Sequence, residues 1–201
     1  MTGVQTCALP IALDRGQFDR EEEVLWPDGC AAMYRKPMLD QIGGFDEDFF
    51  ADGDDAELGL RARIAGWLCL YTPRAVVRHH RGATLGKDSA WRLQLIERNR
   101  VLLAVKLFPW SLLALNPFYY AARLAAGALL AHGGQGDTAH FPGVGGKLAI
   151  VRALAAGDFA ALRLIPRMLR KRAQIRRIRR LTPGDVRRLL LAHRLSLKEV
   201  A

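Results

Sequence analysis

Carboxylates are concentrated in one short stretch of the chain, residues 44–57, where seven of fourteen side chains are acidic. Phe45, Phe49 and Phe50 lie between them, and a purely solvated acidic loop has little need of such aromatic residues. Aromatic side chains packed beside carboxylates are typical of a wall that directs acidic groups toward a cleft. Such carboxylates can bind a hard cation, accept a proton as a general base, or cap a helix. The residue types alone leave these three roles open.

A second candidate for chemistry is the pair His79 and His80, which follows a predicted short strand. Because neighbouring side chains on a strand point to opposite faces, the two imidazoles cannot both bind one metal ion in regular geometry. A single histidine is more often a satisfied surface residue than a ligand. Cys30 and Cys69 lack the spacing of metal ligands, and we predict that they are core residues.

Positive charge is concentrated at the C-terminal end of the chain. The 201 residues have a formal net charge of +10. Residues 151–201 contain fourteen basic and three acidic side chains, whereas the rest of the chain is nearly neutral. Eight cations lie within residues 167–180 beside an apolar seam, a pattern typical of a helix on an anionic membrane surface. Binding of nucleic acid is disfavoured because Phe159 is the one aromatic residue beyond position 141. The predicted membrane contacts are Arg167, Arg170, Lys171, Arg172, Arg176 and Arg177.

Helices and strands must position these groups, and the clearest helix runs from Asp54 to Gly66. Leu60 and Ile64 fall on its buried stripe, and Asp54 and Asp55 stand at its N-terminal end, where the helix dipole favours carboxylates. Glu57 and Arg61 form an i, i+4 pair of opposite charge. Other predicted helices cover residues 89–107 and 148–181, a short one begins at Lys36, and a last one starts after Thr182. Predicted strands cover residues 68–71 and 75–77, and residues 25–34 are a further candidate.

Two other segments need separate treatment. The apolar, charge-free run Leu107–Ala122 is shorter than the roughly 20 residues of a spanning helix. We therefore predict an interfacial or re-entrant element or a helical hairpin rather than a membrane span. Residues 1–11 resemble the translation of a sequencing-library adapter, and they contain no basic region followed by a long apolar core. They are predicted to be an artefact that plays no part in the fold.

Several blocks of the chain, taken in order, resemble the family 2 glycosyltransferases, and most closely the rhamnosyltransferase-like branch that builds bacterial surface polysaccharides. Because the blocks are independent and keep their order, together they are far more specific than any one alone. They are WPDGCAAMYR at 26–35, IGGFDEDFF at 42–50, DDAEL at 54–58 with Arg61, AGW at 65–67, YTPRAVVRH at 71–79 and ERNR at 97–100.

The resemblance implies a fold, a reaction and a set of site residues. The fold is α/β: a partial GT-A (nucleotide-diphospho-sugar transferase) fold lacking its N-terminal half, followed by an α-helical C-terminal extension. The reaction is an inverting transfer in which the acidic block supplies the catalytic base, and this base falls on Asp55. Asp54 and Glu57 are acidic variants of the family's usual residues at their positions. The catalytic support falls on Asp54, Glu57 and Arg61, the acceptor side on Asp46, Glu47, Phe50 and Trp67, and a metal or diphosphate contact on His79.

The resemblance also implies partners and a location. The donor is a nucleotide sugar, the acceptor a polysaccharide or lipid-linked hydroxyl, and the cofactor a divalent cation, Mg²⁺ or Mn²⁺. The enzyme works on the inner, cytoplasmic face of the bacterial plasma membrane, with an anionic membrane surface as partner. The family's N-terminal half, with its Asp-x-Asp metal motif, has no counterpart upstream of residue 44. We therefore expect a fragment with an incomplete sheet that is inactive alone.

These expectations divide the chain into four parts. Residues 1–11 are the artefact, and residues 12–107 are the C-terminal half of the catalytic domain. Residues 108–142 form an apolar helical segment and a glycine-rich linker, and residues 143–201 form basic amphipathic helices. The alternative hypothesis is a non-enzymatic, basic module that binds a membrane surface or nucleic acid and whose acidic block is structural.

Overall fold

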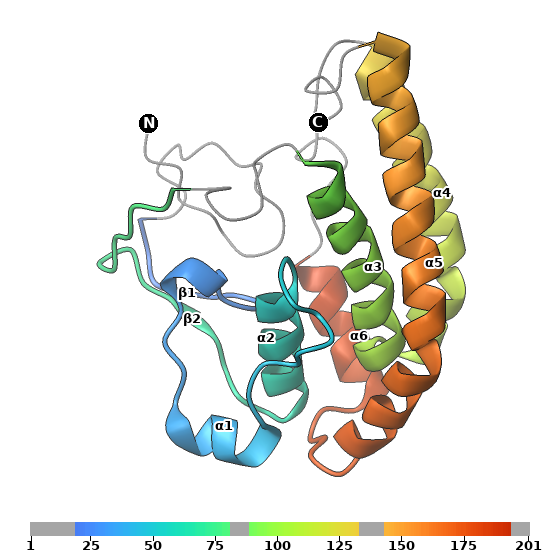
Figure 1. The fold of residues 1–201 in the computed structure, drawn as a ribbon. Coiled ribbons are helices and arrows are strands. Elements are labelled where there is room, and N and C mark those ends of the chain that lie inside the picture. Colours follow the sequence, from blue (N-terminus) through green and yellow to red (C-terminus); the bar gives the residue numbers. More distant parts are fainter. Residues whose placement is uncertain (1–18, 81–88, 133–142, 194–201) are drawn as a thin grey trace.

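The computed structural model describes residues 19–80, 89–132 and 143–193, with the backbone alone for 126–132 and 143–144. Most of this part of the chain is helical, and α5 packs along α3, with α4 on the same side of the molecule (Figure 1). In chain order the elements are β1 (Glu22–Glu23), the 3₁₀ helix η1 (Gly29–Ala31), α1 (Lys36–Ile42), α2 (Asp54–Ile64), β2 (Leu70–Tyr71), α3 (Ala90–Leu107), α4 (Trp110–His132), α5 (Gly143–Ile175) and α6 (Pro183–Ala192).

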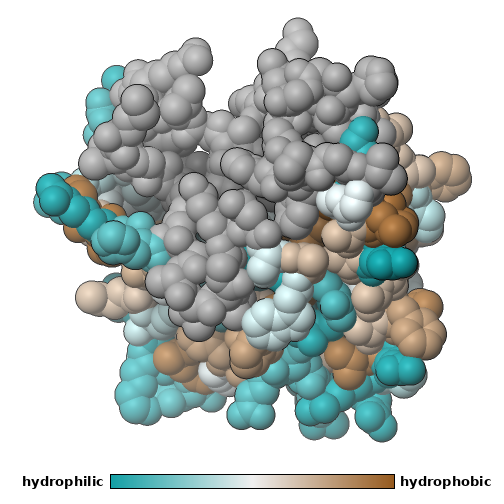
Figure 2. All heavy atoms as spheres, turned by 45° about the horizontal axis from the view of Figure 1, so that its top comes forward, coloured by the Kyte–Doolittle hydropathy of each residue, from teal (hydrophilic) through white to brown (hydrophobic). Residues whose placement is uncertain are grey.

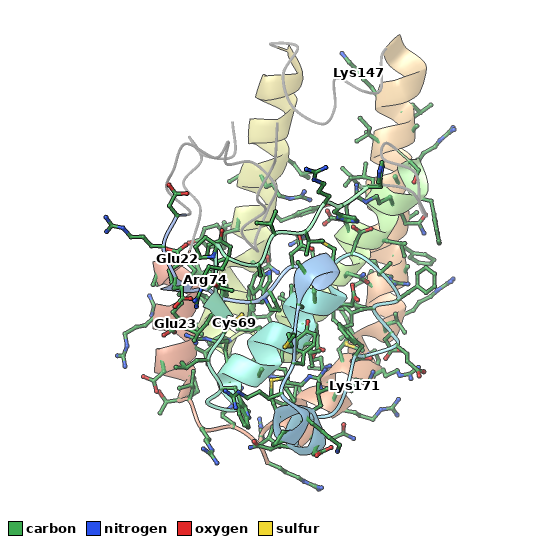
Figure 3. The ribbon with its side chains drawn as sticks, turned by 90° about the vertical axis from the view of Figure 1, so that its left-hand side faces the viewer. Glu22, Glu23, Cys69, Arg74, Lys147 and Lys171 are labelled. Atoms are coloured by element: carbon green, nitrogen blue, oxygen red, sulfur yellow. The ribbon has the colours of Figure 1, made fainter. Side chains whose placement is uncertain are left out.

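The predicted α/β sheet is not formed in the described part of the chain. Its strands are one antiparallel pair, in which Glu22 of β1 lies opposite Tyr71 of β2. Figure 3 shows Glu23, Cys69 and Arg74 beside this pair. The strand predicted at 25–34 is wrong, since this segment contains η1, and the one predicted at 75–77 is wrong as well. Pro73 stands between β2 and that second segment, and a proline cannot donate a hydrogen bond to a ladder.

Most predicted helices are confirmed, together with the residues that start and stop them. Gly43 ends α1 with a φ of 83°, in the region where glycine is favoured. Ser89 begins α3, and its side chain accepts a hydrogen bond from the Arg92 backbone amide at 3.1 Å. Thr182 and Asp185 form a capping box at the start of α6.

The apolar segment after α3 forms one continuous helix, α4, of 23 residues that passes through Pro117. No helix in the described ranges is both long enough and apolar enough to cross a membrane. α4 and α5 run in opposite directions (Figure 1), and the segment is one helix and not a hairpin within residues 107–122. α5 ends at Ile175, earlier than predicted, and the predicted linker at 133–142 lies outside the described residues.

The hydrophobic core surrounds α2 and α3 and includes the basic C-terminal helices. Leu60 and Ile64, predicted on the buried stripe of α2, pack with Ile175 of α5 and Val186 of α6. A second cluster joins α1 to α2, and a third joins Phe49 and α3 to Met168 of α5. The C-terminal helices therefore share one core with the segment that carries the acidic block.

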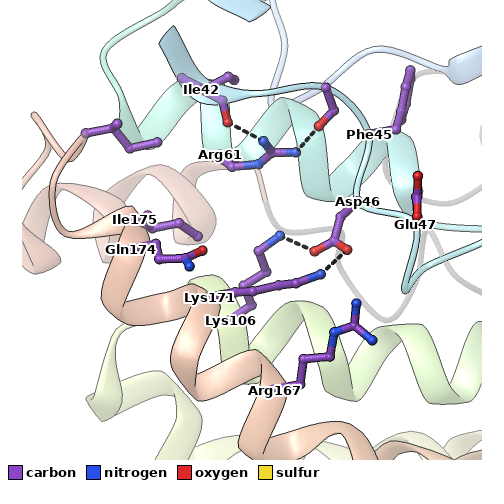
Figure 4. A pocket seen from close by; sticks show the side chains of 12 residues that line it. Ile42, Phe45, Asp46, Glu47, Arg61, Lys106, Arg167, Lys171, Gln174 and Ile175 are labelled. Atoms are coloured by element: carbon purple, nitrogen blue, oxygen red, sulfur yellow. Dashed lines mark hydrogen bonds and ion pairs between the residues drawn. The ribbon is translucent and has the colours of Figure 1, made fainter. Parts of the chain in front are cut away.

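A network of buried charges fixes the acidic loop, residues 44–53, between α2, α3 and α5. Lys106 of α3 pairs with Asp46 at 2.6 Å and with Glu57 at 2.5 Å, and its side chain is 4% exposed. Lys171 of α5 pairs with Asp46 and also with Asp48, the latter at 2.6 Å. Figure 4 shows both ammonium groups directed at the Asp46 carboxylate. Buried charges are tolerated only when they are paired in this way, so these contacts hold the loop in one position.

Two of the six predicted membrane contacts are corrected by this packing. Lys171 is bound to the acidic loop, and Arg172 is 7% exposed, donates a hydrogen bond to the Val105 carbonyl at 3.0 Å and lies over the Trp110 ring. Both side chains point inward because α5 packs on α3. Arg167 is half exposed and pairs with Asp48 at 2.8 Å. The other three, Arg170, Arg176 and Arg177, are exposed.

Gly157 allows α5 to lie directly on α3. A Cβ atom at this position would stand 2.6 Å from the Gln94 carbonyl oxygen and 3.2 Å from the Arg98 amide nitrogen, both backbone atoms. Gly157→Ala should therefore separate the helices and lower the free energy of unfolding by roughly 1–3 kcal/mol in urea denaturation. Gly145→Ala, also in α5 but with nothing within 4 Å, is the matched control and should not destabilise the protein. Equal effects of the two changes would contradict the close packing.

Asp46 makes the stability depend on pH. Burial raises its pKa, but hydrogen bonds from Lys106 and Lys171 outweigh this effect and lower the pKa from 3.8 to about 2. A depressed pKa stabilises the fold at pH values above 3.8, and this stabilisation is lost as the pH falls through about 2. Asp46→Asn should thus cost about 2 kcal/mol or more of unfolding free energy at neutral pH, and less near pH 2.

Denaturant titrations at several pH values measure this dependence. The control is Asp40→Asn, which removes an exposed pair with Lys36 and should change the stability little at any pH. A pH-independent loss in Asp46→Asn would show that the ion pairs do not account for its effect.

Candidate functional site

Asp55 lies in the first turn of α2, half-buried, and backbone amides fix its carboxylate. Oδ2 accepts a hydrogen bond from the Gly29 amide at 2.9 Å, and Oδ1 accepts one from the Ala56 amide at 2.7 Å. Burial raises the pKa of Asp55; the two amides oppose the rise, and the nearby charge of Asp54 adds to it. A carboxylate whose pKa is raised is a stronger base when ionised, which suits proton abstraction.

Close packing of the segment before η1 positions the Gly29 amide. A Cβ atom on Gly59 of α2 would lie 2.3 Å from the Cβ of Trp26 and 3.0 Å from its Cα. Because Gly59 has no side chain, residues 26–29 can lie directly against α2. The WPDG sequence block therefore has a structural role next to the candidate base.

The other acidic residues of the block have different surroundings. The residue that caps the start of α2 is Gly53, in a left-handed conformation with a φ of 99°, and not Asp54. Burial raises the pKa of Asp54. Glu57 is fully buried and forms a two-point ion pair with Arg61 at 2.8 and 3.0 Å, as the i, i+4 spacing predicts. Since helix positions two residues apart differ by about 200°, Glu57 points away from the side that Asp55 occupies.

Arg61 extends the contacts of Glu57 to the chain that enters the acidic loop. Its guanidinium donates hydrogen bonds to the carbonyls of Ile42 and Gly44, the latter at 2.7 Å (Figure 4). Glu57 and Arg61, predicted as catalytic support, are thus the structural link between α2 and this loop.

Two residues that the sequence reasoning did not single out, Arg98 and Asn99 of α3, hold the other end of the loop. The Asn99 side-chain amide donates to the carbonyls of Phe49, Ala51 and Asp52 at 2.7–2.8 Å. Arg98 donates to the Phe49 carbonyl at 2.9 Å. Phe50 and Asp52 have positive φ values of 61° and 60°, a conformation that persists only where surroundings enforce it. The sequence feature that could have indicated this role is the ERNR block at 97–100.

The predicted acceptor-side residues do not meet at one place. Asp46 and Glu47 line a pocket of about 410 Å³ with Arg61, Lys106 and Lys171 (Figure 4). Phe50 is exposed and its ring lies 5.9 Å from that of Trp91. The indole of Trp67 donates to the Gln41 side chain at 2.9 Å, beside α1.

His79 lies in an exposed segment after β2, and neither it nor Asp55 lines the pocket. Across 19–80, 89–132 and 143–193, no group of three His, Cys, Asp or Glu side chains could hold a metal ion. The residues present therefore do not fit the expected divalent cation, and no step of the chemistry is assigned to one. The prediction of core cysteines is wrong for Cys30, which is exposed in η1, while Cys69 is half-buried.

Part of the sequence matches a known protein family. Residues 11–101 match the family described as glycosyltransferase like family 2. The N-acetylglucosaminyl-diphospho-decaprenol L-rhamnosyltransferase of Mycobacterium tuberculosis is 41% identical over 73 residues, 36% of this chain and 24% of the relative, in both strains CDC 1551 and H37Rv. The O-antigen biosynthesis protein RfbC of Myxococcus xanthus is 30% identical over 80 residues, 40% of this chain and 6% of that protein.

The matched region includes the acidic loop, α2 and most of α3. The chain spans about a quarter of the length of the rhamnosyltransferases it matches. No solved structure is significantly similar to it. The segment that holds Asp55, the acidic loop and its Asn99 anchor is the part that matches glycosyltransferase family 2.

Proposed function

We propose that this chain carries the catalytic base and acceptor side of an inverting sugar transferase. The observation that supports the proposal most directly is the Asp55 carboxylate, held by the Gly29 and Ala56 amides at the start of α2 with a pKa raised by burial. A base of this kind needs a fixed position and enough basicity to accept a proton from a hydroxyl group.

In the proposed reaction Asp55 accepts the proton of the acceptor hydroxyl while the hydroxyl oxygen attacks the anomeric carbon of the donor. A new carbon–oxygen bond forms as the bond to the nucleotide diphosphate breaks on the opposite side, so the configuration inverts. The leaving group departs with the electron pair, and the proton stays on Asp55. His79 is proposed to contact the diphosphate, and Asp54 to raise the basicity of Asp55 through its negative charge.

The names of the relatives support a class of substrates. One pair is named for transfer of L-rhamnose to an N-acetylglucosaminyl-diphospho-decaprenol, and the third for O-antigen synthesis. We propose a nucleotide sugar of hexosyl or rhamnosyl type as donor and a lipid-linked or cell-surface polysaccharide hydroxyl as acceptor. Such an acceptor is anchored in a membrane, so the chain is proposed to work peripherally on the inner face of the bacterial plasma membrane.

We further propose that the chain is inactive alone, and that donor and cation binding need sequence beyond it. The chain covers about a quarter of the length of the rhamnosyltransferases, and its described residues offer no cation site. The alternative, a non-enzymatic basic module, loses two of its six predicted contacts, because Lys171 and Arg172 are engaged inside the protein.

Asp55→Asn is the direct test of the base, made in a full-length protein that contains this segment. The amide cannot accept the proton, so the rate of sugar transfer should fall by about 10²–10⁴-fold while the affinity for the nucleotide sugar is retained. The measurements are turnover and donor titration by calorimetry, with Asp40→Asn, an exposed residue of α1, as control. Retained turnover would remove Asp55 from its role.

The pH profile gives a second readout for Asp55. Because its pKa is raised above 3.8, the acid limb of kcat/KM should lie above that value, since a protonated carboxyl cannot act as base. An acid limb at or below 3.8 would contradict the assignment.

His79→Ala tests the proposed diphosphate contact. Loss of a group that binds the donor in both ground and transition states should raise KM for the nucleotide sugar several-fold with a smaller change in kcat. His80→Ala, the adjacent exposed histidine, is the matched control. If both variants behave alike, His79 has no special role at the donor.

A further inference from the structure

The outer side of α5 is apolar although it faces solvent. Its inner side, with Gly157, Ala161 and Met168, packs on α3. An ordinary amphipathic helix has only one such apolar side. A second apolar stripe runs along the exposed side, and Phe159 and Leu162 within it are 57% and 60% exposed. The stripe consists of Leu148, Val151, Ala155, Phe159, Leu162, Pro166 and Leu169, spaced by three or four residues throughout.

α4 beside it is also apolar and exposed. Phe118 is 74% exposed and Tyr119 60%, and Trp110, Leu115 and Leu124 are exposed as well. In the space-filling view, apolar side chains gather toward the right-hand edge, the side on which α4 and α5 lie (Figure 2). We call the exposed apolar side chains of these two helices the α4–α5 face.

Leu113 packs against the third core cluster, and polar contacts also attach α4 to the rest of the protein. The Tyr120 hydroxyl donates a hydrogen bond to Asp158 of α5 at 2.6 Å, and this contact and burial raise its pKa to about 12. Arg123 pairs with Glu97 of α3, and Arg100 donates to the Asn116 side chain at 3.2 Å. The described inner side of α4 therefore combines Leu113 with polar contacts, while Phe118 and Tyr119 on the helix remain exposed.

The charges around the face have one sign. Asp158 is the single acidic residue in the sequences of α4 and α5, and its carboxylate is bound by Tyr120. Exposed arginines flank the α5 stripe at 152, 163 and 170, and the guanidinium of Arg163 lies 4.4 Å from the centroid of the Phe159 ring. Lys147 and Lys171 lie toward the two ends of α5 (Figure 3).

We infer that the α4–α5 face lies on the surface of an anionic bilayer, with its aromatic and aliphatic side chains in the headgroup boundary. Exposed apolar side chains flanked by arginines, with no exposed carboxylate on either helix, fit such a surface. A second copy of the chain would instead bring two rows of like charges together. The contact therefore shares Arg170 with the predicted basic segment 167–177 but leaves out Lys171 and Arg172, which are engaged inside the protein. The inference specifies the membrane location contained in the proposed function.

The experiment is vesicle flotation of the chain with liposomes of phosphatidylcholine containing about one third phosphatidylglycerol. The double variant Phe118→Glu/Phe159→Glu should lower the partition constant at least about tenfold, because two apolar rings are lost and two negative charges are added. Met33→Glu, at a site that is 98% exposed between η1 and α1, is the matched control and should bind like the unchanged chain. Unchanged thermal unfolding verifies the fold, and Leu115→Glu/Leu162→Glu serves if the first pair does not fold.

Each outcome decides the inference. Binding that is lost in the face variants, kept in the control, weakened by salt and weak on pure phosphatidylcholine supports it. Face variants that still bind, or loss confined to Arg176→Ser/Arg177→Ser, would overturn it in favour of the basic segment. A change of oligomeric mass without loss of vesicle binding would assign the face to a second copy. Sugar transfer is not needed for the assay, so failure of Asp55 as base leaves this result unaffected, and the reverse also holds.

Discussion

The fully buried carboxylate of Glu57 is the constraint on which the rest of the structure depends. A charge removed from water in this way is stable only with partners, and Arg61 and Lys106 provide them at 2.8 and 2.5 Å. Arg61 then binds the carbonyls that lead into the acidic loop, and Lys106 binds Asp46 inside it. Satisfying one carboxylate thus fixes the relative positions of α2, α3 and the loop.

The same arrangement separates the two tasks of the acidic block. Glu57 and Asp46 face the interior and are neutralised by cations, while Asp55 faces residues 26–29 and is held by backbone amides alone. Cationic partners lower the pKa of Asp46, whereas burial without a cation raises that of Asp55. Asp46 and Asp55 are nine residues apart and differ in basicity because their neighbours differ. Of the two, Asp55, which is held without a cation, is suited to act as a base.

Local patterns in the sequence were enough to predict α1, α2, α3 and α6, because their signals lie within one element, whereas the single helix α4 and the end of α5 were not predicted. The stop at Gly43, the stripe of Leu60 and Ile64, the cap at Ser89 and the capping box at Thr182 are all of this kind. The strand predicted at 68–71 contains β2, but its partner β1 was not predicted, and the segments 25–34 and 75–77 form no strand, since a strand needs a partner that no local pattern identifies. The roles of Lys171 and Asn99 depend on contacts with residues 47 to 125 positions away along the chain, which no local pattern reveals.

The arginine and lysine side chains of α5 do not form one surface, although their number in the sequence suggests it. Lys171 and Arg172 neutralise or cap groups inside the protein, because the turn that carries them packs on α3. The arginines at 152, 163 and 170 stand on the opposite side, beside apolar residues that nothing in the described chain covers. α5 stabilises the acidic loop on one side and carries an exposed apolar stripe on the other. The position of the loop is therefore coupled to the surface that the stripe contacts. The proposed bilayer contact and the cation that holds the acidic loop are thus carried by the same helix.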